Sequence, residues 1–105
     1  MNQKILNLLG LCKRSGNLSL GYDATIESIT KKKAKLCLIA SDASDRVKDR
    51  MQKNCENMKT AVFVTDFEIK DFESSIGKSV AVLSVNEKGF AEKIKTLLGE
   101  GLNDN

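Results

Sequence analysis

Two segments near the start of the chain have their apolar positions spaced with the period of an α-helix. The first segment has this spacing at Ile5, Leu8, Leu9 and Cys12, and the second has it at Tyr22, Thr25, Ile26 and Ile29. Positions i, i+3, i+4 and i+7 lie on one face of a helix. We therefore expect one helix over roughly residues 2–14, ended by Gly16, and a second from Gly21 to the lysines at 31–33.

Three later runs are apolar at nearly every position, namely residues 36–40, 60–64 and 80–83. Short continuous apolar runs are typical of interior strands that are covered on both faces. Between the first two runs, Ser44 is expected to cap a crossover helix. After the second run, Thr65 and Glu68 have the spacing of a capping box, which predicts a short helix ending near Gly77.

The last segment again has helical spacing, at Phe90, Ala91, Ile94, Leu97 and Leu98. Gly99 and Gly101 are expected to stop this helix. Helices that alternate with buried strands predict an α/β fold, a three-layer α/β/α sandwich with a small, largely parallel or mixed central sheet. We expect a single domain over residues 1–99 and a frayed tail over residues 100–105.

Composition and charge restrict the class of protein. The chain has 105 residues, 41% hydrophobic and 30% charged, as in a globular domain rather than a disordered segment. No apolar run approaches the roughly 20 residues of a membrane span, and the start lacks the pattern of a secretory leader, so we expect a cytoplasmic protein. Residues 1–55 carry 11 Lys and Arg against 5 Asp and Glu, whereas residues 56–105 carry 6 against 9. This asymmetry predicts a basic patch at one end of the molecule.

The residues needed for catalysis are scarce. The chain has no His, which removes the usual general acid or base and the paired nucleophiles. The turns after the first two predicted strands contain no Gly, so neither a phosphate-cradling loop nor a dinucleotide fingerprint is present. Asp42 could act as a phosphoacceptor or a metal ligand, but a turn residue before the Ser44 cap is the favoured interpretation. We expect no enzymatic activity, no cofactor and no metal site.

The cysteines give no sign of a redox or metal site. Cys12, Cys37 and Cys55 are odd in number and widely spaced, which fits neither a disulfide framework nor a zinc site. Cys12 and Cys55 lie on predicted apolar helix faces, and Cys37 lies inside a predicted strand. Buried thiols that pack as small hydrophobes are therefore expected.

Four basic residues at predicted helix ends are candidates for phosphate contacts: Lys13, Arg14, Lys31 and Lys32. On charge alone, an ordinary solvated helix end is the better explanation of them. Tyr22 is the only polar aromatic residue, and the four Phe are expected to be mostly buried. Stacking on single-stranded bases therefore has little support.

Several short motifs together resemble one protein family. They are Leu9-Gly10-Leu11-Cys12-Lys13-Arg14, Gly21, Lys33-Ala34-Lys35-Leu36-Cys37-Leu38-Ile39-Ala40-Ser41-Asp42-Ala43-Ser44, Ser75-Ile76-Gly77-Lys78 and Gly89-Phe90-Ala91. In order and spacing this set is similar to the bacterial, YlxQ-type branch of the ribosomal-protein family that binds kink-turn RNA, the L7Ae and L30e type. The likeness covers roughly residues 3–98.

The resemblance implies an α/β/α fold whose RNA-binding face is built from the start of the second helix and the loop before the last strand. In the family, a Gly-x-Asn-Glu-x-x-Lys stretch opens that helix, so that backbone approaches RNA, polar side chains reach guanine edges and the lysine meets phosphate. Gly21 and Asp23 match this stretch, whereas Ala24 replaces the Glu and Glu27 replaces the Lys. A carboxylate that faces phosphate is repulsive, so this departure bears against tight kink-turn binding.

The loop before the last strand matches the family through Ile76, Gly77 and Lys78, while Phe72 and Glu73 replace a Leu-Gly pair. Gly77 could also serve only to end its helix, and Ser79 could bond its own turn instead of RNA. The resemblance and the charge pattern together nominate the following RNA-binding residues: Lys13, Arg14, Gly21, Tyr22, Asp23, Lys31, Lys32, Gly77, Lys78 and Ser79.

Two hypotheses follow from these observations. The first is a non-enzymatic, monomeric protein that binds structured RNA, kink-turn or ribosomal, as a ribosomal or ribosome-associated part of a ribonucleoprotein. The second keeps the fold but makes the chain a protein-interaction adaptor in which RNA binding is weakened or lost. Binding that falls steeply with salt would favour the first hypothesis over the second.

Overall fold

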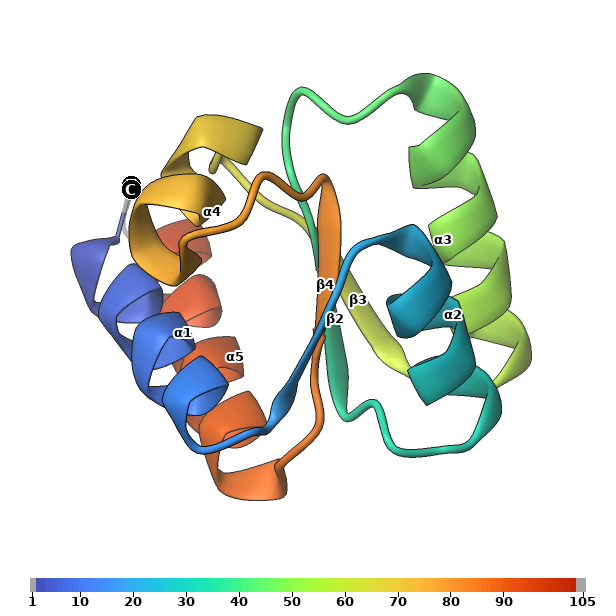
Figure 1. The fold of residues 1–105 in the computed structure, drawn as a ribbon, viewed down its shortest axis with the longest axis horizontal. Helices are drawn as coiled ribbons and strands as arrows, with labels where there is room; N and C mark the ends of the chain where they lie inside the picture. Colours follow the sequence, from blue (N-terminus) through green and yellow to red (C-terminus); the bar gives the residue numbers. More distant parts are fainter. Residues whose placement is uncertain (1, 104–105) are drawn as a thin grey trace.

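The computed structural model describes residues 2–103, which form five helices around a four-stranded sheet (Figure 1). The helices are α1 (Gln3–Arg14), α2 (Tyr22–Thr30), α3 (Asp45–Asn57), α4 (Ile69–Ile76) and α5 (Lys88–Asn103). The strands are β1 (Leu18–Leu20), β2 (Leu36–Ile39), β3 (Ala61–Val64) and β4 (Val82–Val85). The predicted α/β fold is confirmed, and each predicted helix is present.

The strands lie in the order β1-β4-β2-β3, and the sheet is mixed. β2 and β3 are parallel, whereas β4 is antiparallel to both of its neighbours. The chain leaves β3 and enters β4 at the same end of the sheet, where Thr65 N donates to Ile39 O and Ala40 N donates to Ala81 O, each at 2.8 Å. A parallel β4 would have to start at the opposite end. A mixed sheet is therefore correct, and a largely parallel one is wrong.

The strand predictions need three corrections. The sequence pattern does not predict β1, because three residues are too few to display a period. The run at 60–64 is not an interior strand: β3 is an edge strand whose first three residues are half-buried and whose Val64 is exposed. The run at 80–83 begins two residues too early, because Val80 and Ala81 belong to the loop before β4.

The sheet separates two groups of helices, with α1, α4 and α5 on one face and α2 and α3 on the other (Figure 1). The first face buries a cluster that includes Ile5, Leu9, Leu36, Leu38, Phe72 and Ile94. The second buries a smaller cluster that includes Ile29, Cys37, Ile39, Met51, Cys55 and Val82. Successive residues of β2 point into opposite clusters, which is why its sequence is apolar without interruption.

Side-chain caps fix the starts of α3 and α4. Ser44 Oγ accepts from Val47 N at 3.2 Å, which confirms the predicted cap of α3. The predicted capping box of α4 is wrong by three residues, because Glu68 is the N-cap and pairs with Asp71. Thr65 does not take that role, because its buried hydroxyl donates to Ile39 O at 2.9 Å and already accepts from Phe67 N at 3.2 Å.

The ends of the last two helices follow different rules. Gly77 ends α4 with a left-handed φ of 73°, as predicted. α5 instead runs through Gly99 and Gly101 to Asn103, so the predicted glycine stop is wrong. A glycine costs a helix only about 1 kcal/mol, which does not outweigh the packing of α5 on the first cluster. Residues 104 and 105 of the predicted tail lie outside the described residues.

A polar network ties α2 to the sheet at the end away from Gly21. Asn86 Oδ1 accepts from Ser28 Oγ and from Ser84 Oγ, each at 2.8 Å. Asn86 Nδ2 donates to Ser19 Oγ at 2.9 Å. Ser28 and Ser84 are buried, so Asn86 satisfies hydroxyl groups that have no access to water.

All three cysteines are buried, as predicted. Burial raises the pKa of the Cys12 thiol to about 11, and the charge of Glu87 adds to the shift. Cys37 and Cys55 lie together in the second cluster, where a hydrogen bond between the thiols and burial raise the pKa of Cys37.

Within residues 2–103, no group of three or more His, Cys, Asp or Glu is placed to hold a metal ion. Over the same residues, no helix has the length and apolar character needed to cross a membrane.

Candidate RNA-binding surface

The residue that precedes the first turn of α2 is Gly21, which has no side chain. Gly21 has φ of 90° and ψ of 169°, a combination that residues with a side chain rarely adopt. Its N–H donates to Val82 O and its C=O accepts from Thr25 N, each at 3.0 Å, so this conformation is fixed at both ends of the residue. No side chain of the described residues caps the helix. The N–H groups of its first turn therefore remain available to a negatively charged ligand.

The loop between α4 and β4 packs directly against Gly21. A Cβ on Gly21 would lie 4.0 Å from Cγ1 of the buried Val80. Earlier in the same loop, Gly77 is left-handed and Lys78 and Ser79 are exposed. The fold thus brings the start of α2 and the loop before β4 onto one surface, although some 55 residues separate them in the chain.

Lys13 reaches this surface from α1. Its Nζ donates to Ile76 O at 2.7 Å and lies 3.9 Å from the position of a Cβ on Gly77. A cation is favourable here, because the last carbonyls of α4 carry partial negative charge. Lys13 therefore supports the loop and also places a positive charge beside it. Arg14 is exposed next to Lys13 and borders a groove between α1 and α4.

The other nominated side chains at this end differ in what they offer a ligand. Ser79 Oγ donates to the carboxylate of Glu73, so the hydroxyl bonds its own turn. Tyr22 is half-buried against the second cluster, which limits the face of its ring that is open for stacking. Asp23 and Lys78 are exposed, and neither makes an ion pair among the described residues.

Lys31 and Lys32 lie at the opposite end of α2. The helix has 9 residues, so about 13 Å separates them from Gly21. Lys31 Nζ bonds Glu27 Oε1 at 2.7 Å, and this contact lowers the pKa of the exposed Glu27 carboxyl. Lys32 has a left-handed φ of 60° in the turn that ends the helix. The structure does not bring these two lysines together with the other nominated residues.

The sequence pattern does not predict Lys48 as an RNA-binding residue. In the structure, Lys48 lies at the same end of the sheet as Gly21. Its Nζ donates to Ser41 O at 2.8 Å, in the loop after β2. Lys48 lies in a helix whose charges alternate in sign, so the sequence does not distinguish it from an ordinary surface lysine.

Asp42 also lies in the loop after β2. Its Oδ1 accepts from Ile69 N at 2.9 Å and thereby holds the start of α4. Asp42 lies in the turn before Ser44, as the favoured interpretation predicts, but its carboxylate bonds to α4 rather than within that turn.

The chain is similar to known proteins in sequence and in fold. Residues 3–95 match the Ribosomal protein L7Ae/L30e/S12e/Gadd45 family. Over 96 residues the chain is 34% identical to the RNA-binding protein YlxQ of Enterococcus faecium, a match that covers 91% of this chain and 92% of that protein.

Two solved structures superpose on the chain. A protein of unknown function from Bacillus halodurans superposes with a TM-score of 0.89 at 27% identity, and the match covers 94% of this chain and 100% of that protein. The 15.5kD RNA binding protein of Giardia lamblia does so with a TM-score of 0.75 at 17% identity, over 95% of this chain and 89% of that one. At such low identity the second likeness concerns the fold alone.

Proposed function

Because the chain belongs to the ribosomal protein L7Ae/L30e/S12e/Gadd45 family, we propose that it binds structured RNA of the kink-turn type as a monomeric, ribosome-associated protein of the cytoplasm. The family is an RNA-binding and non-catalytic one. This agrees with the expectation from the sequence that the chain is not an enzyme.

The observation that carries the proposal is the bare backbone of Gly21 beside the loop before β4. With no side chain at Gly21 and no cap on α2, RNA can approach the first turn of the helix closely. A sharply kinked RNA presents shape and phosphates rather than loose bases, which suits a surface with one half-buried aromatic ring. Asp23 supplies an exposed acceptor for base edges on that turn.

Cations on either side of Gly77 supply the phosphate contacts in this proposal. Lys78 is exposed, and Lys13 is held beside Gly77 by its hydrogen bond to Ile76 O. Glu27 opposes binding, but its contact with Lys31 offsets part of the negative charge that α2 presents to RNA. We therefore expect affinity that depends on the kinked shape and falls with salt.

The test is a titration of a kink-turn RNA and a straight duplex of equal length at low and moderate salt. Preference for the kinked RNA, lost in a Lys78→Gln variant, is the expected result. Equal and weak binding of both RNAs, unchanged by Lys78→Gln, would contradict the proposal.

The second candidate is a protein-interaction adaptor on the same fold. Ala24 and Glu27 favour it, because both stand where the family pattern has RNA-contacting side chains. An adaptor would bind its partner with little dependence on salt and would ignore the kink. A Glu27→Lys variant that gains kink-turn binding from a wild type that has none would support this candidate.

A further inference from the structure

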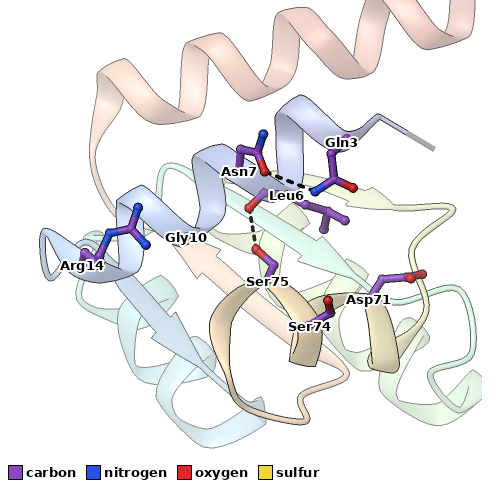
Figure 2. Close-up of a pocket in the computed structure, with 8 residues that line it drawn as sticks. All are labelled: Gln3, Leu6, Asn7, Gly10, Arg14, Asp71, Ser74 and Ser75. Carbon is purple, nitrogen blue, oxygen red and sulfur yellow. Dashed lines mark hydrogen bonds between the residues drawn. The ribbon is translucent and has the colours of Figure 1, made fainter.

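A groove of about 370 Å³ runs along the contact between α1 and α4, two helices on the face of the sheet away from α2 (Figure 2). It is lined by Gln3, Leu6, Asn7, Gly10, Arg14, Asp71, Ser74 and Ser75. Most of these side chains are polar, and the apolar Leu6 is buried at its base. An apolar peptide segment would therefore find little to bind here.

Tight contact between the two helices gives the groove a fixed shape. Ser75 Oγ donates to Leu6 O at 2.5 Å, which ties α4 to the backbone of α1. A Cβ on Gly10 would lie 3.4 Å from Ser75 O, in ordinary van der Waals contact, so the two helices cross closely here. Gly10 is buried at this crossing, and a Cβ on it would lie 3.7 Å from Nη1 of Arg14, so the guanidinium lies over the glycine.

The polar groups along the groove are largely without partners in the part of the chain that the structure describes. Arg14 makes no ion pair or side-chain hydrogen bond there, and its guanidinium lies close to Gly10. Asn7 Oδ1 accepts from Gln3 Nε2 at 3.2 Å, which leaves the Asn7 amide N–H groups free. Ser74 adds an exposed hydroxyl from the opposite wall. Guanidinium and amide donors on the same helix suit phosphate and ribose oxygens.

The groove begins where the candidate RNA-binding surface ends. Lys13, next to Arg14, contacts both Ile76 O and the neighbourhood of Gly77. Positive charge is therefore continuous from the loop before β4 into the Arg14 end of the groove. Asp71 stands at the other end, so a negatively charged ligand is favoured only over the half that contains Arg14.

We propose that the Arg14 half of this groove binds the sugar–phosphate backbone of an RNA arm that extends beyond the kink. Arg14 contacts a phosphate, and Asn7 hydrogen-bonds to phosphate or 2′-hydroxyl oxygens of the same strand. This inference rests on the proposed function, because it extends the same RNA-binding surface across α1.

The test compares three kink-turn RNAs that share the same kink. One has two short arms, and each of the other two has a different one of these arms lengthened. Wild-type protein should bind one of the lengthened RNAs about fivefold more tightly than the short RNA at low salt. Asn7→Glu and Arg14→Gln, two changes in the Arg14 half, should each remove that gain. Gln52→Glu is the matched control, because it makes the same change in net charge at an exposed position of α3 on the other face of the sheet.

The outcomes separate this inference from the proposed function. If the short RNA binds but neither longer arm adds affinity, or if the gain survives in either groove variant, the groove proposal is wrong and the kink-binding surface stands. If neither kinked RNA binds better than a straight duplex, both proposals are wrong. Circular dichroism of each variant establishes that the protein remains folded.

Discussion

The two ends of α2 carry nominated RNA contacts in similar numbers but differ in how the fold treats them. At the N-terminal end, Gly21 leaves backbone N–H groups uncapped beside an exposed loop. At the C-terminal end, Ser28 is bonded to Asn86, and Lys31 is bonded to Glu27. The Ser28 hydroxyl has no proton left to donate, and the charge of Lys31 is offset by Glu27. Lys13, in contrast, bonds a neutral carbonyl and keeps its positive charge for a ligand. Positive charge alone is thus a poor guide to a binding surface.

The largest expected effect concerns the anchored end. Asn86→Ala removes the shared partner of two buried serine hydroxyls and should lower the free energy of unfolding by about 3 kcal/mol. Chemical denaturation measures this change, with the exposed Asn57→Ala as control. RNA affinity of the folded variant should stay within about twofold of wild type. A much larger loss of affinity would mean that the two ends of α2 are not independent.

Gly21→Ala tests the open end. A side chain at this φ and ψ should cost about 2 kcal/mol of stability and should also reduce affinity for kinked RNA at least tenfold. Gly16→Ala is the control, because Gly16 is also left-handed, at φ 77°, and a Cβ on it would have no neighbour within 4 Å. It should lose stability without losing RNA affinity. Equal effects of the two variants on affinity would argue against a special role for Gly21.

Glu27→Lys reverses a charge on α2 that opposes phosphate. Affinity for kink-turn RNA should rise about tenfold at low salt, with a smaller rise at high salt. Glu56→Lys makes the same charge change at an exposed position of α3 and should give a much smaller rise. Comparable gains in the two variants would show that net charge, rather than position, sets the affinity.

Lys32→Gly relieves a left-handed residue at the C-terminal end of α2. The variant should be more stable by about 1 kcal/mol, although it removes a candidate phosphate contact. Lys59→Gly should give the same gain at the end of α3, where φ is 54°. Thermal denaturation measures stability, and a titration should find RNA affinity almost unchanged. A clear loss of RNA affinity in Lys32→Gly but not in Lys59→Gly would show that Lys32 contacts RNA.

The smallest effect concerns the ion pair on α2. Lys31→Gln should raise the pKa of Glu27 toward its ordinary value, because the contact with Lys31 is the main cause of the lowered pKa. A carboxyl whose pKa is lower in the folded state stabilises that state above its unfolded pKa and loses the contribution as pH falls through the folded pKa. Titration of the Glu27 carboxyl by NMR from pH 7 to 2 should detect the shift. An unchanged pKa would mean that the pair does not form in solution.

Periodicity in the sequence was sufficient where one residue and its near neighbours decide the structure. The five helices, the Ser44 cap and the left-handed end at Gly77 each depend on local spacing or on a single residue type. The α4 capping box was misplaced because Thr65 is used by a carbonyl of β2, 26 residues away. The glycine stop in α5 failed for a similar reason, since packing on the first cluster outweighs the local preference of glycine.

The residues of the candidate site also fall into two groups, those that the sequence identifies and those whose place only the structure shows. Gly21, Gly77 and Lys78 were found because their residue types and positions fit the family pattern. Lys31 and Lys32 were nominated by charge, and only their place at the far end of α2 separates them from the rest. Lys48 lies at the same end of the sheet as Gly21 and bonds Ser41 O, a contact that no local pattern predicts.

The helices, the buried strands of the core and the family could be predicted from the sequence alone, because each depends on the spacing and order of residues along the chain. Tertiary structure decided the direction of β4, the edge position of β3 and which polar groups remain free for a ligand. Those features depend on pairing between residues far apart in the chain. The same dependence joins Gly21 to the loop before β4 and opens the groove beside Arg14.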